Sequence, residues 1–267
     1  MDDAGARERL VRFVAEALPI LEDDARVVGV AAGGSFAQGG VDVHSDLDLV
    51  VAVEPAAHAA VLAEAPALAA RLGPLLAAFT GEHVGEPRLL ICLYGPPLLH
   101  VDLKFVALPE LAARVEDPLI LWQREARMRR ALDEGVARWP APDLQWIEDR
   151  FWVWVHYVAG KIARGELLEV IDGLALLRRV ALGPLVAVAT GHRPQGVRRL
   201  ESRAGAWRPA LEATVAGHDR DACIRALYAS IALYRALRDA LASADLRRGE
   251  AAERESILFL DDVASQD

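Results

Sequence analysis

The sequence predicts an α+β fold in which a mixed β-sheet with flanking helices precedes an all-helical region. Short β-branched and apolar runs alternate with helical patterns as far as residue 123, and no run of comparable strand character follows. The proline-rich segment 139–143 (WPAPD) separates the two regions as a stiff connection. We therefore expect a first domain over 1–140 and a helical bundle over 141–267.

The first region contains both helical and strand patterns. An amphipathic helix is expected over 4–18, ending at Pro19. Strands at 26–32 and 47–53 enclose a break at Gly33-Gly34-Ser35. The later elements are expected to be a helix at 56–71, strands at 75–80, 88–94 and 98–106, a short helix at 109–115, an edge strand at 119–122 and a helix at 123–135.

The second region has helical periodicity only. Helices are expected at 143–164, 166–190, 208–216 and 219–243. The last 20 residues are rich in charge, and we expect them to be irregular apart from 257–260.

Composition limits the class of protein. The 267 residues carry a net charge of −9, which argues against a nucleic-acid-binding protein because such proteins normally present a basic face. Cys92 and Cys223 have neither a disulfide nor a zinc spacing, and the polar, acidic start is unlike a signal peptide. No apolar run is long enough for a membrane span. We expect a cytoplasmic protein, a monomer or homodimer, with no membrane or nucleic-acid partner.

One motif carries chemistry. Asp46 and Asp48 begin the strand at 47–53 two residues apart, so both carboxylates lie on one face of the sheet. Two such carboxylates repel each other unless a divalent cation lies between them. Ten residues earlier, Gly33 and Gly34 allow backbone N–H groups to approach an anion, and Ser35 adds a hydroxyl. These residues predict a phosphate site beside a cation site.

A third carboxylate fits the same site. In the run LHVDLKF the alternation places His100, Asp102 and Lys104 on one face of a strand whose other face is apolar. If this strand pairs with 47–53, Asp102 joins Asp46 and Asp48 around one cation. A phosphate site, three carboxylates and Mg²⁺ are suited to displacement at a phosphoryl group.

The arrangement strand–GGS–x10–DLD–strand, followed by an aspartate on a neighbouring strand, resembles the DNA polymerase β-like nucleotidyltransferase superfamily over about residues 26–106. The helical second region is similar to that of antibiotic nucleotidyltransferases, which modify a hydroxyl of an aminoglycoside or lincosamide. The resemblance implies that Asp46 and Asp48 hold Mg²⁺, and that Asp102 is a third ligand or the base. It implies that Gly34 and Ser35 bind the triphosphate.

The resemblance also implies that the helical domain contributes to catalysis. Such domains supply a basic residue to the phosphates, and Lys161 is the first candidate because a compact ammonium suits a triphosphate, with Arg164 second. Some of these enzymes place a carboxylate there to accept the proton of the acceptor hydroxyl. Glu166 is the first choice, ahead of Glu169 and Asp172, although Asp102 remains an alternative.

Three functions are consistent with these residues. The leading hypothesis is a Mg²⁺-dependent nucleotidyltransferase that moves a nucleoside monophosphate, AMP from ATP, to a hydroxyl of a small molecule, with antibiotic resistance as the role implied by the resemblance. A second is a transferase that modifies proteins, as toxin–antitoxin relatives do. A third is a non-catalytic nucleotide-binding module, which an intact acidic triplet disfavours.

Overall fold

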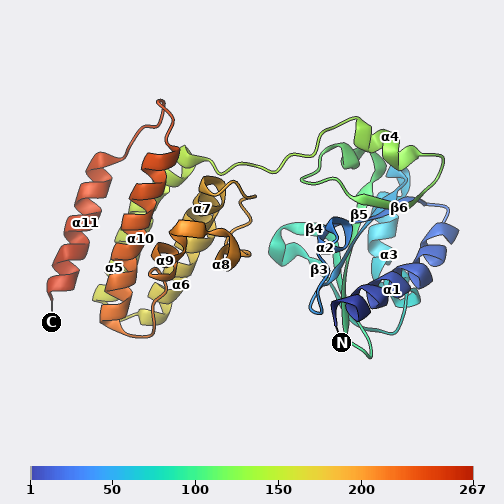
Figure 1. Ribbon diagram of the computed structural model, residues 1–267, viewed down its shortest axis with the longest axis horizontal. Helices are drawn as coiled ribbons and strands as arrows, with labels where there is room; N and C mark the ends of the chain where they lie inside the picture. The colour runs from blue at the N-terminus through green and yellow to red at the C-terminus, as the bar shows by residue number, and fades with distance from the viewer. Residues whose placement is uncertain (1, 267) are drawn as a thin grey trace. The chain divides into compact units, whose positions relative to one another are not determined.

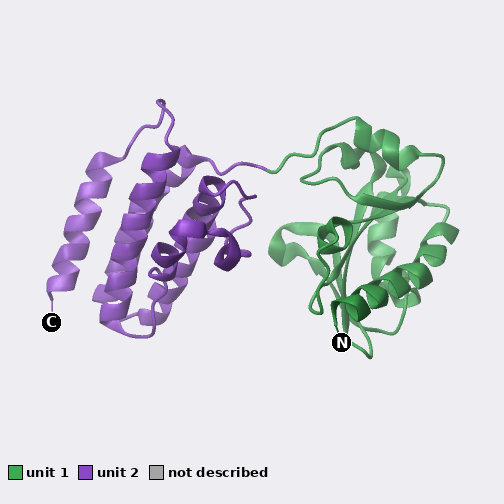
Figure 2. Ribbon diagram, in the orientation of Figure 1, with its two compact units in different colours: residues 1–139 green, residues 140–267 purple. Residues whose placement is uncertain are grey.

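The computed structural model describes residues 2–266 and confirms the predicted α+β class: a six-stranded mixed sheet in the N-terminal half and helices in the C-terminal half (Figure 1). The chain divides into two compact units, the first ending at Trp139 and the second beginning at Pro140 (Figure 2). Each unit is described by itself. Among the described residues, no helix combines the length and apolar character needed to cross a bilayer.

The first unit is built on a sheet with the strand order β3-β4-β5-β2-β1-β6, in which only β2 and β5 pair in parallel. Its strands are β1 Val27–Ala32, β2 Leu47–Val53, β3 Leu75–Gly81, β4 Glu86–Tyr94, β5 Leu99–Ala107 and β6 Leu119–Gln123. Its α-helices are α1 Asp3–Asp23, α2 Gly34–Gln38, α3 His58–Arg71 and α4 Arg127–Asp133, and a 3-10 segment, η3, spans Leu108–Ala112.

The two faces of this sheet have different environments. Helices α1 and α3 pack on one face, where the alternate residues Leu47 and Leu49 of β2 and Val101 and Leu103 of β5 join a common apolar core. On the opposite face, Val106 near the end of β5 packs with residues of η3 and α4 in a smaller core. Because strand residues alternate between faces, the polar residues at the beginnings of β2 and β5 belong to this second face.

The second unit is a helical bundle whose core draws on α5, α6, α7, α10 and α11. Asp143 and Asp219 cap the N-termini of α5 and α10, each accepting a backbone N–H three residues on. The helices of the unit are α5 Leu144–Ala163, α6 Leu167–Leu177, α7 Gly183–Ala189, α8 Leu200–Arg203, α9 Arg208–Glu212, α10 Arg220–Leu241 and α11 Glu250–Ser265.

Two predictions of secondary structure were wrong, one for the end of the first helix and one for the last 20 residues. Helix α1 does not end at Pro19 but continues to Asp23, because Leu21 is buried in the sheet core and this packing outweighs the donor that proline lacks. The last 20 residues are not irregular, since α11 occupies most of them. Its buried positions Ser256, Leu260 and Val263 have helical spacing, which the many charges of the segment obscure.

Several predicted helices are shorter than expected. The helix at 166–190 is interrupted by a π-helical segment, Arg178–Leu182, before α7 resumes with Pro184 in its first turn. The helix at 208–216 stops at Glu212, and that at 109–115 is the 3-10 segment η3. Gln123 belongs to β6 rather than to a helix, because it pairs with Gly29 of β1. The periodicity of apolar residues does not reveal a π-helical interruption, a 3-10 segment or a strand pairing of this kind.

Candidate active site

The glycine turn (residues 33–35) follows β1, includes the first two residues of α2 and packs directly on β2. Gly33 N–H donates to the carbonyl of Asp48 at 2.9 Å, which fixes the turn against the strand. Gly34 has a φ of +56°, and a Cβ at this position would overlap the carboxylate oxygen Oδ2 of Asp48. Only glycine therefore satisfies both the backbone conformation and the close approach to the aspartate.

Two polar groups of the glycine turn bear on ligand binding. The hydroxyl of Ser35 is buried, and within residues 2–266 it has no hydrogen-bond partner. An unsatisfied buried hydroxyl is costly, and a bound ligand would relieve that cost. The N–H of Gly34 donates to Glu116 Oε1 at 3.3 Å. An anion at this turn would find one hydroxyl without a partner and one amide that a carboxylate already occupies.

The acidic residues converge through strand register. Asp48 of β2 and Asp102 of β5 are Cα partners in the parallel pairing, so their side chains leave the same face of the sheet side by side. Asp46 immediately precedes β2. Burial raises the pKa of Asp102, the nearby His100 lowers it, and the negative charge of Asp46 raises it further. The charge of Asp46 therefore acts on Asp102, which is the strand partner of Asp48.

The polar neighbours of Asp102 on β5 each have a carboxylate partner. His100 Nε2 lies 2.9 Å from Asp102 Oδ1, whose side chain is 21% exposed. Lys104 Nζ lies 2.7 Å from Glu86 Oε2 on the adjacent strand β4. His100 therefore orients the Asp102 carboxylate, while Lys104 is held by Glu86.

The carboxylates fit a magnesium ion by the chemistry of their donors, since Mg²⁺ prefers oxygen ligands and is held by one or two carboxylates together with phosphates. Asp48 and Asp102 on neighbouring strands supply two such ligands, and Asp46 is electrostatically linked to Asp102. Across residues 2–266, no three His, Cys, Asp or Glu side chains stand as a ready-formed metal site. Asp48 and Asp102 therefore stand as a pair of oxygen donors in the part of the chain that the structure describes.

The candidates in the second unit also form a cluster. Lys161 Nζ donates to Glu166 Oε2 at 2.5 Å, and Arg164 lies 3.8 Å from the other oxygen of the same carboxylate. Lys161 also lies over the ring of Tyr157, whose hydroxyl donates to Glu169. The hydrogen bond raises the pKa of Lys161 and lowers that of Glu166. The lysine and the carboxylate predicted for separate roles are thus each other's partners.

Two acidic residues near the first-unit site were missed by sequence analysis. Glu116, between η3 and β6, accepts from Gly34, and Glu86 on β4 pairs with Lys104. Glu116 has no local signal, because its partner lies 82 residues earlier in the chain. Glu86 has no local signal either, because Lys104 pairs with Leu89 in the strand register and reaches Glu86 through its side chain.

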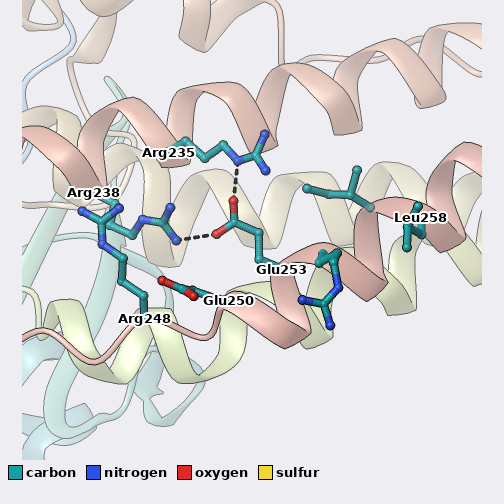
Figure 3. A pocket seen from close by; sticks show the side chains of 8 residues that line it. Arg235, Arg238, Arg248, Glu250, Glu253 and Leu258 are labelled. Carbon is teal, nitrogen blue, oxygen red and sulfur yellow. Dashed lines mark hydrogen bonds and ion pairs between the residues drawn. The ribbon is translucent and has the colours of Figure 1, made fainter.

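A hollow of about 430 Å³ lies elsewhere, between α10 and α11 of the second unit (Figure 3). Its arginines already have acidic partners: Glu253 is bonded to both Arg235 and Arg238, and Arg248 lies 2.9 Å from Asp239. These ion pairs connect the helices that form the hollow.

Two solved structures align with nearly the whole chain. An aminoglycoside 6-adenyltransferase from Bacillus subtilis aligns over 95% of this chain and 98% of its own, at 15% identity and a TM-score of 0.41. A nucleotidyltransferase-like protein from Exiguobacterium sibiricum aligns over 94% of this chain and 88% of its own, at 12% identity and a TM-score of 0.38. No protein-family model matches the sequence, and no curated protein is similar to it in sequence.

Proposed function

We propose that this protein is a magnesium-dependent nucleotidyltransferase that transfers AMP from ATP to a hydroxyl of a small molecule. One observation carries the proposal: Asp48 and Asp102 are partners on neighbouring parallel strands, and the glycine turn packs against Asp48. Carboxylates beside a glycine-lined anion site are the combination that phosphoryl and nucleotidyl transfer requires. The sequence motif and the register of the two strands support it independently.

In the first unit, one set of residues would bind Mg²⁺ and another would bind the triphosphate. Asp46, Asp48 and Asp102 would hold Mg²⁺, which when bound supplies positive charge to the phosphates. The Gly34 amide and the Ser35 hydroxyl would bind the triphosphate, and the buried, unpartnered state of Ser35 Oγ among the described residues supports that role. The site needs both sets, because the carboxylates alone would repel a nucleotide.

The proton of the acceptor hydroxyl requires a base, for which Asp102 and Glu166 are the candidates. As the hydroxyl oxygen bonds to the α-phosphorus, its proton passes to the base and pyrophosphate leaves. Burial raises the pKa of Asp102, whereas Lys161 lowers that of Glu166. A higher pKa makes a carboxylate a better proton acceptor, which favours Asp102 as the base where Asp46 and Asp48 hold the cation without it. As a third ligand of Mg²⁺, Asp102 would have a lower pKa, and the role of base would fall to Glu166.

The second unit would act on the nucleotide tail and the acceptor. Lys161 and Arg164 would bind phosphate oxygens, and Glu166 would then exchange a lysine partner for a hydroxyl or ammonium of the acceptor. The first half of the chain has a large excess of acids, with eleven acidic and four basic residues over 31–123. This charge favours a cationic acceptor such as an aminoglycoside- or lincosamide-type antibiotic.

The test is a pyrophosphate-release assay with Mg²⁺, each of the four ribonucleoside triphosphates and a panel of aminoglycosides and lincosamides. We expect release with ATP and at least one acceptor, and a nucleotide adduct on that acceptor by mass spectrometry. Asp48→Asn should abolish release, whereas the control Asp133→Asn, an exposed position on α4, should not. Binding of Mg-ATP without turnover would indicate a non-catalytic module, and an adduct on a co-expressed protein would indicate a protein-modifying enzyme.

A further inference from the structure

Glu116 places a carboxylate on the glycine turn. Its Oε1 accepts the N–H of Gly34 at 3.3 Å, and its Oε2 accepts Gln38 Nε2 at 3.1 Å. The same Oε1 lies 3.6 Å from where a Cβ of Gly33 would stand. The half-buried Glu116 carboxylate therefore lies across the turn and accepts from the first residue of α2, Gly34, and from the last, Gln38.

A phosphate oxygen bound at the glycine turn would accept the same Gly34 N–H that Glu116 Oε1 now accepts. A carboxylate oxygen and a phosphate oxygen are both anionic acceptors, and the single N–H of Gly34 serves one of them at a time. Asp48 already places a second carboxylate against Gly34. A triphosphate entering beside two carboxylates meets repulsion from both, and only Asp48 belongs to the predicted cation ligands.

We infer that Glu116 is an internal competitor of the nucleotide: it occupies the Gly34 amide when no nucleotide is bound and leaves it when the triphosphate binds. The inference rests on the proposed function, because it takes the glycine turn to be the triphosphate site. Gln38 strengthens the competition by holding the second carboxylate oxygen. A site whose binding-competent form is populated one tenth of the time loses about tenfold in apparent affinity.

The experiment measures binding rather than turnover. The full-length protein is titrated by calorimetry with Mg²⁺ and an ATP analogue whose α,β-bridging oxygen is replaced by methylene. The variants are Glu116→Ala, Glu116→Gln and Gln38→Ala, and the control is Glu134→Gln, which removes the same charge from an exposed position after α4. Thermal melting of each variant verifies that it is folded.

We expect Glu116→Ala to bind the analogue about tenfold more tightly than wild type, since the competitor is removed. Glu116→Gln should show a smaller gain, because the amide oxygen still accepts from Gly34 without the charge. Gln38→Ala should also tighten binding, and Glu134→Gln should leave it unchanged.

Two outcomes overturn the inference, and they are distinguishable. In the first, wild type binds the analogue and the folded Glu116 variants bind it with equal or weaker affinity. This result would show that Glu116 supports the turn or the nucleotide, and it would leave the proposed function intact. Absence of binding in wild type and in all variants would remove the nucleotide site and the inference together. Binding that is detectable only in the Glu116 variants would support both.

Discussion

Asp48 on β2 and Asp102 on β5 are direct partners in the one parallel pairing of the sheet, so two carboxylates from distant parts of the chain leave the same face at the same height. The residues on either side of each aspartate point into the core under α1 and α3. The core thereby fixes the register, and a slip of either strand by one residue would send its carboxylate to the apolar face.

Asp102→Asn should raise thermal stability at neutral pH. Burial raises the pKa of Asp102 above its ordinary 3.8, so the folded protein holds the proton more tightly than the unfolded chain does. The stability that this carboxyl contributes therefore falls as pH rises from about 4 through the raised pKa. We expect the melting temperature of the variant to equal or exceed that of wild type at pH 7, with the difference vanishing below pH 4.

The same variant separates a functional from a structural role for Asp102. Pyrophosphate release should fall by about 10²-fold or more, in the range for loss of a general base. Added Mg²⁺ should raise the melting temperature of wild type more than that of Asp102→Asn, because only wild type keeps the full set of carboxylates. A variant that melts far below wild type at pH 7 would instead assign Asp102 to the support of the fold.

Gly34→Ala should damage the site more than the fold. The added Cβ would overlap Asp48 Oδ2, and Gly34 has a positive φ that costs an alanine about 1 kcal/mol or more. We expect a loss of stability of about 1–3 kcal/mol in urea unfolding, together with loss of nucleotide binding because the Asp48 carboxylate is displaced. Gly39→Ala, also at a positive φ but with open space around its Cβ, is the matched control. Equal losses of binding in both variants would contradict the role given to the Asp48 contact.

Much of the first-unit site could be predicted from the sequence because its signals are local. The alternation in LHVDLKF predicts that Asp102 and Leu103 lie on opposite faces of the strand, and Leu103 is indeed in the apolar core. The two-residue spacing of Asp46 and Asp48 predicts a common face for these two carboxylates. The break at Gly33-Gly34 marks the turn. Each of these follows from the two-residue period of a strand or from the freedom of glycine.

The parts that could not be predicted depend on contacts across the chain. Glu116 reaches the glycine turn from a loop with no pattern of its own, and no spacing connects it to Gly34. Helix α11 was missed because its charges suggest a solvated tail, whereas Glu253 is paired with Arg238 and Ser256 bonds to the carbonyl of Trp152. Tertiary partners decide such positions, and a single sequence does not reveal them.

Glu86→Gln should destabilise the protein at neutral pH and have little effect at pH 2. Hydrogen bonds from Arg88 and Lys104 lower the pKa of Glu86 from 4.5 to about 2. A lowered pKa gives stability that is present above pH 4.5 and is lost as pH falls from 4.5 to about 2. The full shift corresponds to about 3 kcal/mol, so we expect a loss of about 2–3 kcal/mol at pH 7 in chemical denaturation.

The control for Glu86→Gln is Glu134→Gln, which removes a carboxylate from an exposed position and should leave the pH profile unchanged. Glu86→Gln also removes the ion-pair partner of Lys104, which lies on the same face of β5 as Asp102. A difference between wild type and Glu86→Gln that stays constant from pH 2 to pH 7 would show that the ion pairs with Arg88 and Lys104 do not set its stability.

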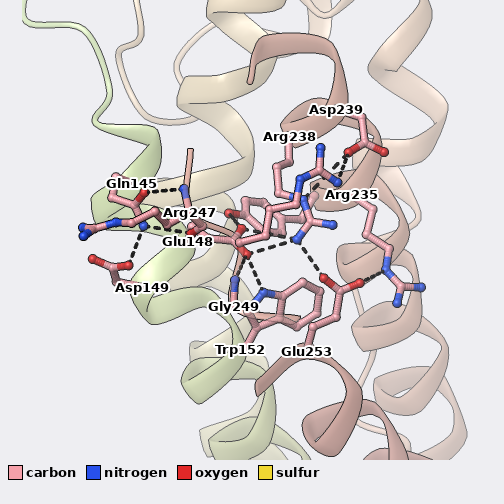
Figure 4. A network of polar contacts seen from close by, with 12 residues as sticks. Gln145, Glu148, Asp149, Trp152, Arg235, Arg238, Asp239, Arg247, Gly249 and Glu253 are labelled. Carbon is pink, nitrogen blue, oxygen red and sulfur yellow. Dashed lines mark hydrogen bonds and ion pairs between the residues drawn. The ribbon is translucent and has the colours of Figure 1, made fainter. Parts of the chain in front are cut away.

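Glu148 is the centre of a buried polar network in the second unit (Figure 4). Its carboxylate accepts from Trp152 Nε1 at 3.1 Å, Tyr234 Oη at 2.5 Å, Arg238 Nη1 at 3.1 Å and the N–H of Gly249 at 2.9 Å. The donors come from α5, from α10 and from the residue before α11. One side chain thus satisfies groups on three elements, and its ionised form is favoured despite its burial.

Glu148→Ala should therefore destabilise the bundle strongly. It would remove one of the two carboxylates that bind Arg238, which keeps its ion pair with Glu253. It would also leave the buried donors of Trp152 and Tyr234 without their acceptor, so we expect a loss of about 3 kcal/mol, at the lower end of the cost of breaking a buried ion pair. Glu148→Gln should cost less, since the amide oxygen still accepts some of the same bonds. Glu255→Ala on α11, whose carboxylate is 65% exposed, should cost less than about 1 kcal/mol. Urea unfolding of the full-length protein, followed by tryptophan fluorescence, measures these differences, and a Glu148→Ala variant that unfolds like Glu255→Ala would show that Glu148 does not hold the bundle together.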